Sequence, residues 1–157
     1  MYLQKFTRQQ ALPKIKQFCA YQERCHSEIK EKLYGFGLTT NESEEIITKL
    51  IEENYLNEER FAIQFAGGKF RIKQWGRIKI KYELKKKNVS EYCIKKALFA
   101  LNDTDYIATL SKLADTKFRL LKNEKNQFAK KKKLQTHLRL KGYEGDLIQE
   151  VLIKLIK

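Results

Sequence analysis

Basic side chains gather in two segments of the sequence, where they could neutralise the phosphate groups of a nucleic acid. In residues 69–96, eleven lysines and arginines are opposed only by Glu83 and Glu91. In residues 117–141, ten basic residues are opposed by Glu124 alone. Contacts from lysine and arginine to phosphates supply most of the affinity of sequence-independent nucleic-acid binding. The two segments therefore predict an acidic partner, such as nucleic acid or a nucleoprotein.

Aromatic side chains lie among these basic residues and could stack on bases or anchor a protein interface. Trp75 stands beside Gly76 at a predicted turn, where either partial exposure or core packing stays open, whereas Phe70 and Tyr92 are expected in the core. We select eleven candidate contact residues from the two segments. They are Lys69, Arg71, Lys73, Trp75, Arg77, Lys79 and Lys81, with Lys130, Lys131, Lys132 and Lys133.

A metal site is the other chemistry that the residue types suggest. Cys25 and His26 are adjacent, and Cys19 stands six residues before Cys25. A structural zinc ion usually needs four ligands in paired spacings, and only Cys93 and His137 could complete the set, from distant parts of the chain. Three cysteines also argue against a disulfide framework. We expect buried helical cysteines, no bound metal and no cofactor.

Sequence motifs for catalysis are missing from the chain. It contains no P-loop, no GxGxxG and no HExxH pattern. Asp103 and Asp105 follow Asn102 in an arrangement typical of a helix start rather than of a catalytic pair. Because no residues are left to carry a reaction, we expect that the protein is not an enzyme.

The composition limits the class of protein. The 157 residues carry 33 Lys and Arg against 19 Asp and Glu, a formal net charge of +14, and 42% are hydrophobic. That hydrophobic fraction supports a packed core and argues against global disorder. No apolar run approaches the roughly 18 residues of a membrane-spanning helix, and the first ten residues lack the apolar stretch of a secretory signal. We expect a cytoplasmic protein of one domain or a few very small ones.

Helices are the expected secondary structure, because the chain has only one proline and seven glycines. Capping patterns predict three helix starts. Thr7 with Gln10 marks the first, Asn41 with Glu44 the second, and Asn57 the third.

Three segments align without gaps and predict internal repeats: residues 28–38, 79–89 and 133–143. Each has an apolar pair four residues apart, then a Gly or Asn suited to the left-handed backbone after a helix end, then an apolar residue. The pairs are Ile29/Leu33, Ile80/Leu84 and Leu134/Leu138, the stop residues are Gly37, Asn88 and Gly142, and the next residues are Leu38, Val89 and Tyr143. The alignment favours a helix over a strand for residues 76–87, in spite of their alternating pattern.

The predicted fold is all-α, with three tandem three-helix repeats that form an elongated, curved helical array. The predicted repeats are residues 1–55, 56–101 and 102–157. Repeats of about 50 residues are marginal alone, so neighbours should pack on each other. Residues 41–59 hold seven glutamates against Lys49, so the first repeat could meet a basic protein surface. Ile78 and Tyr82 form a second apolar stripe, which should pack on a neighbouring repeat or on a partner.

The segment of residues 55–89 resembles the central region of the RecX family of regulatory proteins. The matching residues are Tyr55-Leu56, Glu58-Glu59, Arg60-Phe61-Ala62, Gly76, Arg77-Ile78, Glu83-Leu84 and Lys87-Asn88-Val89. The stretches ERCHSEIKEKL and HLRLKGY also fit, so the resemblance covers nearly the whole chain. The chain departs from the family at Cys25, where many members have a serine that caps a helix, and at Asn88, where Gly is common.

The resemblance implies a modulator of the RecA recombinase. Members of the family bind RecA, lie along the groove of its filament on DNA, and inhibit strand exchange, ATP hydrolysis and coprotease activity. The resemblance thus implies a protein that binds RecA and the RecA–DNA filament in DNA repair, recombination and the SOS response, and we expect this protein to be a monomer. Reversing Lys73, Arg77 and Lys81 to glutamate is expected to weaken filament binding without unfolding the chain.

Two other classes of function stay open. One is a helical repeat module that binds DNA or RNA directly, without RecA. Its affinity should fall steeply with salt, with a slope near −0.7 per phosphate for single strands. The other is a helical protein adaptor whose lysines only keep it soluble.

Overall fold

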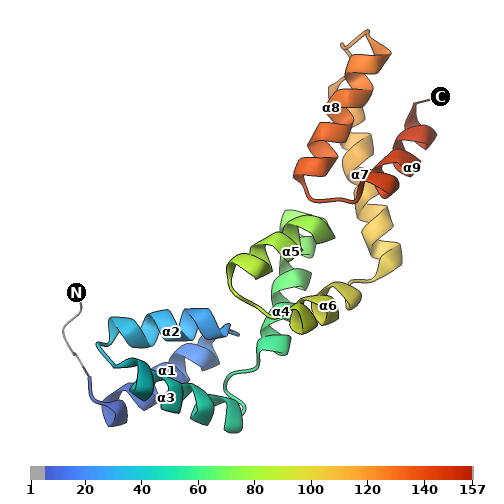
Figure 1. The fold of residues 1–157 in the computed structure, drawn as a ribbon. Helices are drawn as coiled ribbons and strands as arrows, with labels where there is room; N and C mark the ends of the chain where they lie inside the picture. The colour runs from blue at the N-terminus through green and yellow to red at the C-terminus, as the bar shows by residue number, and fades with distance from the viewer. Residues whose placement is uncertain (1–5, 157) are drawn as a thin grey trace. The chain divides into compact units, whose positions relative to one another are not determined.

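The computed structural model describes residues 6–156, and this range forms helices and connecting turns without any strand (Figure 1). The all-α prediction is confirmed. The helices are α1 (Arg8–Tyr21), α2 (His26–Gly35), α3 (Thr40–Glu52), α4 (Glu58–Gly68), the π-helix η1 (Lys69–Lys73), α5 (Arg77–Lys86), α6 (Glu91–Phe99), α7 (Asp103–Leu120), α8 (Gln127–Leu140) and α9 (Gly145–Leu155). Within this range, none of the helices has both the length and the apolar character needed to cross a membrane.

Two of the three predicted helix starts are confirmed. The hydroxyl of Thr7 accepts the N–H of Gln10 at 3.2 Å, and the Gln10 side chain accepts the N–H of Thr7 at 3.0 Å. At the start of α4, the Asn57 side chain accepts the N–H of Arg60 at 3.0 Å. In both cases a side chain satisfies a backbone donor that the first turn of a helix leaves without a partner.

The predicted cap at Asn41 is wrong. Helix α3 begins at Thr40, and Thr39 is its N-cap: the Thr39 hydroxyl accepts the N–H of Glu42 at 3.2 Å, and the Glu42 side chain accepts the N–H of Thr39 at 2.9 Å. Thr39 and Glu42 have the same spacing as the predicted pair and form a complete capping box two residues earlier. The earlier box therefore sets the start of the helix.

The chain divides into two compact bodies. Of the described residues, the N-terminal body contains 6–65 and 84–97, and the C-terminal body contains 66–83 and 98–156. The three predicted repeats, with boundaries after residues 55 and 101, stay a prediction as a domain division.

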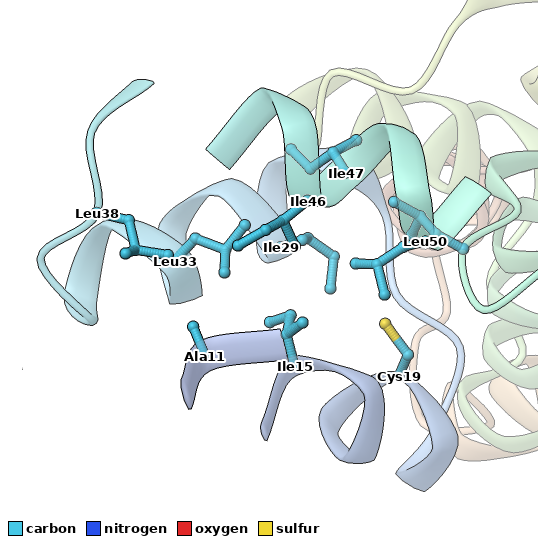
Figure 2. Close-up of a cluster of buried hydrophobic side chains, with 10 residues drawn as sticks. Ala11, Ile15, Cys19, Ile29, Leu33, Leu38, Ile46, Ile47 and Leu50 are labelled. Carbon is cyan, nitrogen blue, oxygen red and sulfur yellow. The ribbon is translucent and has the colours of Figure 1, made fainter. Parts of the chain in front are cut away.

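Helices α1, α2 and α3 enclose the hydrophobic core of the N-terminal body (Figure 2). Side chains three or four residues apart lie on one face of each helix and point toward the other two helices. They are Ala11, Ile15 and Cys19 from α1, Ile29 and Leu33 from α2, and Ile46, Ile47 and Leu50 from α3, with Leu38 from the turn after α2. The predicted pair Ile29/Leu33 is thus confirmed as core.

Helices α7, α8 and α9 pack together in the C-terminal body. Leu134 and Leu138, the predicted apolar pair of α8, are fully buried. Leu110 lies buried on α7, and Ile148 and Leu152 lie buried on α9. Each of these three helices therefore contributes apolar side chains to a shared core.

Left-handed residues end the second helix of each predicted repeat. Gly37, Asn88 and Gly142 have φ angles of 82°, 63° and 100°, as the repeat pattern predicts. In each case the next residue donates its N–H to the carbonyl five residues earlier, at 3.3, 3.1 and 3.3 Å. This arrangement satisfies carbonyls at the helix end and turns the following apolar side chain into the core. Leu38, Val89 and Tyr143 are accordingly buried.

The start of α5 meets the end of α8 through their backbones, at a contact that we call the α5–α8 junction. Gly76 donates its N–H to the carbonyl of Lys141 at 2.7 Å, and Ile78 donates to the carbonyl of Gly142 at 2.9 Å. A Cβ atom on Gly76 would lie 2.3 Å from the Gly142 oxygen. Only glycine leaves enough room at residue 76 for this approach.

A similar junction joins α2 to the turn after α5 in the N-terminal body. The hydroxyl of Ser27, the second residue of α2, donates to the carbonyl of Lys87 at 2.8 Å. The repeat alignment, extended by one residue before position 28, places Ser27 at the position of Ile78 and Lys87 at the position of Lys141, although Ile78 itself donates to Gly142. The same helix ends thus meet at both places, with a hydroxyl donor in one and a backbone donor in the other.

Ion pairs at the two junctions also correspond. His26, the first residue of α2, has its Nδ1 atom 3.0 Å from the carboxylate of Glu58. Arg77, the first residue of α5, has a guanidinium nitrogen 2.8 Å from the carboxylate of Asp103. Glu58 and Asp103 each follow the asparagine that caps a helix. The repeats therefore share side-chain chemistry at the junctions as well as a common helix pattern.

We predict that Gly76→Ala destabilises the C-terminal body by about 1–3 kcal/mol, because the added methyl group forces the two backbones apart. Gly68→Ala is the matched control. Gly68 is helical, and a Cβ there would meet no atom within 4 Å, so alanine should stabilise by up to about 1 kcal/mol. Thermal unfolding followed by circular dichroism measures both changes. Equal melting temperatures for the two variants would contradict the close approach at Gly76.

Candidate functional site

All eleven candidate residues lie in the C-terminal body. Lys69, Arg71 and Lys73 belong to the π-helix η1, and Trp75 follows it in the turn before α5. Arg77, Lys79 and Lys81 belong to α5, and the four lysines 130–133 belong to α8. Their exposure and contacts divide them into side chains that a partner could reach and side chains that the fold already uses.

The π-helix η1 changes the direction of the chain after α4. Gly67 lies under the guanidinium of Arg71, and a Cβ at Gly67 would approach an Arg71 nitrogen to 2.8 Å. The wide turn ends at Gln74, which is left-handed with φ of 59°, while Trp75 donates its N–H to the carbonyl of Lys69 at 3.3 Å. Arg71 and Lys73 remain exposed on this segment.

Two lysine ammonium groups lie over the ring of Trp75. The Nζ atom of Lys69 is 5.0 Å from the centre of the Trp75 ring, and the Nζ atom of Lys79 is 4.8 Å away. Such distances allow cation–π attraction. The indole is half-buried, so an aromatic surface with positive charge beside it reaches solvent.

The turn that carries Trp75 is held by the end of α8. The hydroxyl of Tyr143 donates to the carbonyl of Gln74 at 2.9 Å, and the ammonium of Lys141 donates to the carbonyl of Lys73 at 3.3 Å. Together with the α5–α8 junction, these bonds fix the backbone on both sides of the indole.

The side chain of Arg77 is held by contacts within the fold. Its guanidinium donates to Glu144 at 2.9 Å and to Asp103 at 2.8 Å, and it lies 3.8 Å from the centre of the Tyr106 ring. Its backbone N–H donates to the Tyr106 hydroxyl at 2.8 Å. Burial alone would lower the pKa of Arg77, but the hydrogen bond and charge of Glu144 raise the pKa above its usual value.

Tyr106 is the buried centre of this cluster. Its ring packs against Phe70 at 5.8 Å and against Tyr143 at 5.1 Å between centroids, and its hydroxyl donates to Glu144. Burial, followed by the hydrogen bond to Glu144, raises the pKa of Tyr106 well above its usual value. A glutamate at residue 77 would face two carboxylates here. We therefore leave Arg77 out of the surface proposed below.

The four lysines 130–133 are not equivalent. Lys130 is buried, with its Nζ atom 4.4 Å from the centre of the Phe118 ring, and Lys131 is half-buried. Lys132 and Lys133 are exposed, and the ammonium of Lys133 lies 2.8 Å from the carboxylate of Glu124. Lys132 and Lys133 are therefore exposed to a partner, Lys133 together with the carboxylate of Glu124, and Lys131 is only partly accessible.

Lys132 and Lys133 line a groove between α7 and α8 with four residues that the sequence had not singled out. We call it the α7–α8 groove, and its other lining residues are Lys117, Thr136, His137 and Leu140. Thr136, His137 and Leu140 follow the two lysines at multiples of four residues along α8. That spacing, once α8 is recognised as a helix, is the signal that could have found them.

Apolar side chains are exposed among the basic residues of the first group. Ile72 is 80% exposed, Ile78 is 53% exposed and Tyr82 is 61% exposed. Phe70 is buried, as predicted, whereas the prediction of a core position for Tyr92 is wrong, because its side chain is 63% exposed. The second apolar stripe of α5 is thus largely open to solvent, beside Lys79 and Lys81.

In residues 6–156, no three His, Cys, Asp or Glu side chains come together in a way that could hold a metal ion. Cys19 and Cys25 are buried, and burial raises the pKa of both thiols. Cys25 precedes α2, where its N–H donates to the Glu28 carboxylate at 3.0 Å. Glu28 thus supplies part of the capping at this helix start.

Comparisons with known proteins match two parts of the chain to family models. Residues 57–98 match the second three-helix domain of RecX, and residues 103–152 match its third three-helix domain.

Curated relatives carry the same family name. "Regulatory protein RecX" of Pelodictyon phaeoclathratiforme is 33% identical over 135 residues, which cover 85% of this chain and 82% of the relative. The protein of that name in Clostridium perfringens strain 13 is 32% identical over 133 residues, which cover 84% of this chain and 62% of the relative. The chain thus spans less than two thirds of the length of the Clostridium relative.

Two solved structures have a similar fold. The crystal structure of RecX from Lactobacillus salivarius superposes with a TM-score of 0.86 at 22% identity, covering 94% of this chain and 96% of that one. A crystal structure of regulatory protein RecX gives a TM-score of 0.83 at 22% identity, covering 92% and 70%. With the domain matches and the curated relatives, these likenesses show that the chain belongs to the RecX family of regulatory proteins.

Proposed function

We propose that this protein binds the RecA recombinase on DNA and inhibits its strand exchange, ATP hydrolysis and coprotease activity. Membership of a family of regulatory proteins is the observation that carries the proposal. RecA enters as the partner through the family resemblance, and the basic surface of the C-terminal body suits a partner that contains DNA.

The proposed DNA-facing surface consists of Lys69, Arg71, Lys73, Trp75, Lys79 and Lys81. We call it the tryptophan surface. Two ammonium groups lie over the indole, exposed basic side chains extend the surface along η1 and α5, and Ile72 and Ile78 add apolar area. Charge beside an aromatic ring is the combination that single-stranded nucleic acid favours, because phosphates pair with the cations and bases stack on the ring.

Direct binding to DNA or RNA without RecA is the second candidate function. It draws on the same surface and on the net charge of +14. The two candidates differ in whether RecA changes the binding, so an assay with RecA separates them.

We expect a molar excess of the protein to slow both the ATPase activity and the strand exchange of RecA assembled on single-stranded DNA. The physical reason is occupation of the filament by a protein that contacts both RecA and DNA. The measurement compares both rates with and without the protein. Unchanged rates, together with tight binding to free DNA, would transfer the function to direct nucleic-acid binding.

The triple variant Arg71→Glu, Lys73→Glu and Lys81→Glu should bind single-stranded DNA at least about tenfold more weakly at moderate salt. The salt slope should also fall by about 0.7 for each phosphate that the variant no longer neutralises. All three side chains are exposed, so the fold should survive.

The matched control for that variant reverses Lys30, Lys49 and Lys112, which are exposed and lie outside the tryptophan surface. It makes the same change in net charge. Equal weakening by both variants would mean that total charge, rather than this surface, determines the affinity.

Trp75 is the only tryptophan in the chain, so its fluorescence reports on this surface alone. We expect single-stranded DNA to quench it. Trp75→Ala should lower the affinity by about 1–3 kcal/mol, the usual value of one base stacked on an aromatic ring. Trp75→Phe should retain most of the binding. Fluorescence that stays constant up to saturation with DNA would remove the indole from the interface.

A further inference from the structure

The α7–α8 groove concentrates basic side chains on one face of the C-terminal body. It has a volume of about 340 Å³ and is lined by Lys117 from α7 and by Lys132, Lys133, Thr136, His137 and Leu140 from α8. No carboxylate lines it. The spacing of the α8 residues places them along one side of that helix, next to the last turn of α7.

Lys117 and Lys132 give this groove positive charge that no carboxylate neutralises. Among the ion pairs of the described chain, neither lysine has a carboxylate partner, whereas Lys133 lies 2.8 Å from the carboxylate of Glu124. Two ammonium groups without a counter-charge attract an anion more strongly than paired ones do. The hydroxyl of Thr136 adds a neutral hydrogen-bond donor beside them.

His137 is the titratable group of the groove. Burial lowers its pKa, and the positive charges of Lys117 on α7 and Lys141 at the end of α8 lower it further. Lys133 stands one turn before it on α8. Helix α9 contributes no lining residue, and its Gln149 meets α8 at Gln135, where the two amides hydrogen-bond at 3.3 Å. The free protein therefore holds a neutral imidazole among cations near neutral pH.

We propose that the α7–α8 groove binds one phosphodiester group of a nucleic-acid backbone, with Lys117 and Lys132 on its oxygens and with His137 taking up a proton from solvent as the complex forms. The inference extends the proposed function, because it gives that function a second phosphate contact, separate from the tryptophan surface. No covalent bond forms or breaks. The anion compensates the positive charge that otherwise keeps the imidazole neutral.

The coupling predicts how affinity depends on pH. The phosphodiester keeps one negative charge throughout, so only His137 titrates in the groove. At a pH above the pKa of His137 in both the free protein and the complex, the imidazole is neutral in both states and adds nothing to the affinity. As the pH falls below the raised pKa of the complex, only the bound protein is protonated, and binding strengthens. Below the lowered pKa of the free protein the gain levels off.

The test measures binding of a single-stranded oligodeoxynucleotide to the full chain between about pH 5.5 and about pH 8, at fixed ionic strength and with a label that is insensitive to pH. If binding raises the pKa of His137 by about one unit, the affinity gains about tenfold across this range. His137→Gln should remove this gain. His26→Gln is the matched control, because it removes the only other histidine, and it should keep the gain.

Two further variants test the charge of the groove. Lys117→Gln and Lys132→Gln should each lower the salt slope, by about 0.7 for one phosphate that is no longer neutralised, and should reduce the gain at low pH. Inorganic phosphate at the ionic strength of the assay should compete weakly, which separates a backbone site from a site for free phosphate. Tighter binding of inorganic phosphate than of the oligonucleotide would overturn the assignment.

A pH gain that persists in His137→Gln, with the fold intact by circular dichroism, would overturn the inference. Competition by an acidic peptide gives a second way to overturn it. If the peptide displaces the oligonucleotide from the wild-type chain but not from the Lys117→Gln and Lys132→Gln variants, the groove belongs to a protein partner. The RecA assays separate the two proposals. If the protein does not inhibit RecA but the gain in affinity at low pH depends on His137, only the proposed function fails. If the protein inhibits RecA but the gain at low pH does not depend on His137, only this inference fails.

Discussion

The start of α5 and the end of α8 approach so closely that no side chain fits between them at Gly76. The first backbone N–H groups of a helix and its last carbonyls have no partners within the helix. Here the donors of Gly76 and Ile78 meet the acceptors of Lys141 and Gly142, so each helix end satisfies the other. The positive end of one helix dipole also faces the negative end of the other. The turn with Trp75 and the cluster around Tyr106 both take their positions from this contact.

Some basic side chains pair or pack with other residues of the fold, and others are accessible to a partner. Their neighbours in the structure, rather than their residue type, decide which. Arg77 neutralises Glu144 and Asp103, Lys130 covers Phe118, and Lys133 pairs with Glu124. The count of 21 basic residues in the two segments therefore overstates the charge that a partner meets there. The remaining basic side chains lie around Trp75 in the tryptophan surface and around His137 in the α7–α8 groove.

Apart from the helix start at Asn41, the sequence was sufficient for features that depend on neighbours along the chain. Stops at Gly37, Asn88 and Gly142 and apolar pairs four residues apart are local signals, and they predict the helices correctly. Arg77 could not be assigned in this way, because its partner Glu144 is 67 residues away. The burial of Lys130 likewise depends on how α7 and α8 pack. The pKa of His137 is lowered in part by the charge of Lys117, which belongs to another helix, so the sequence could not reveal this effect.

Gly76 precedes α5 and has no side chain that could cap it, although its carbonyl accepts the first bond of the helix, from Ile80. The acceptors that replace the missing cap are the carbonyls of Lys141 and Gly142, in a turn more than sixty residues later in the chain. Helix α5 therefore gains part of its stability only after α8 has folded and ended at Gly142. In repeat proteins, such a contact is the nearest-neighbour coupling that makes adjacent repeats fold cooperatively. One pair of glycines thus links the order of folding of the middle repeat to that of the next.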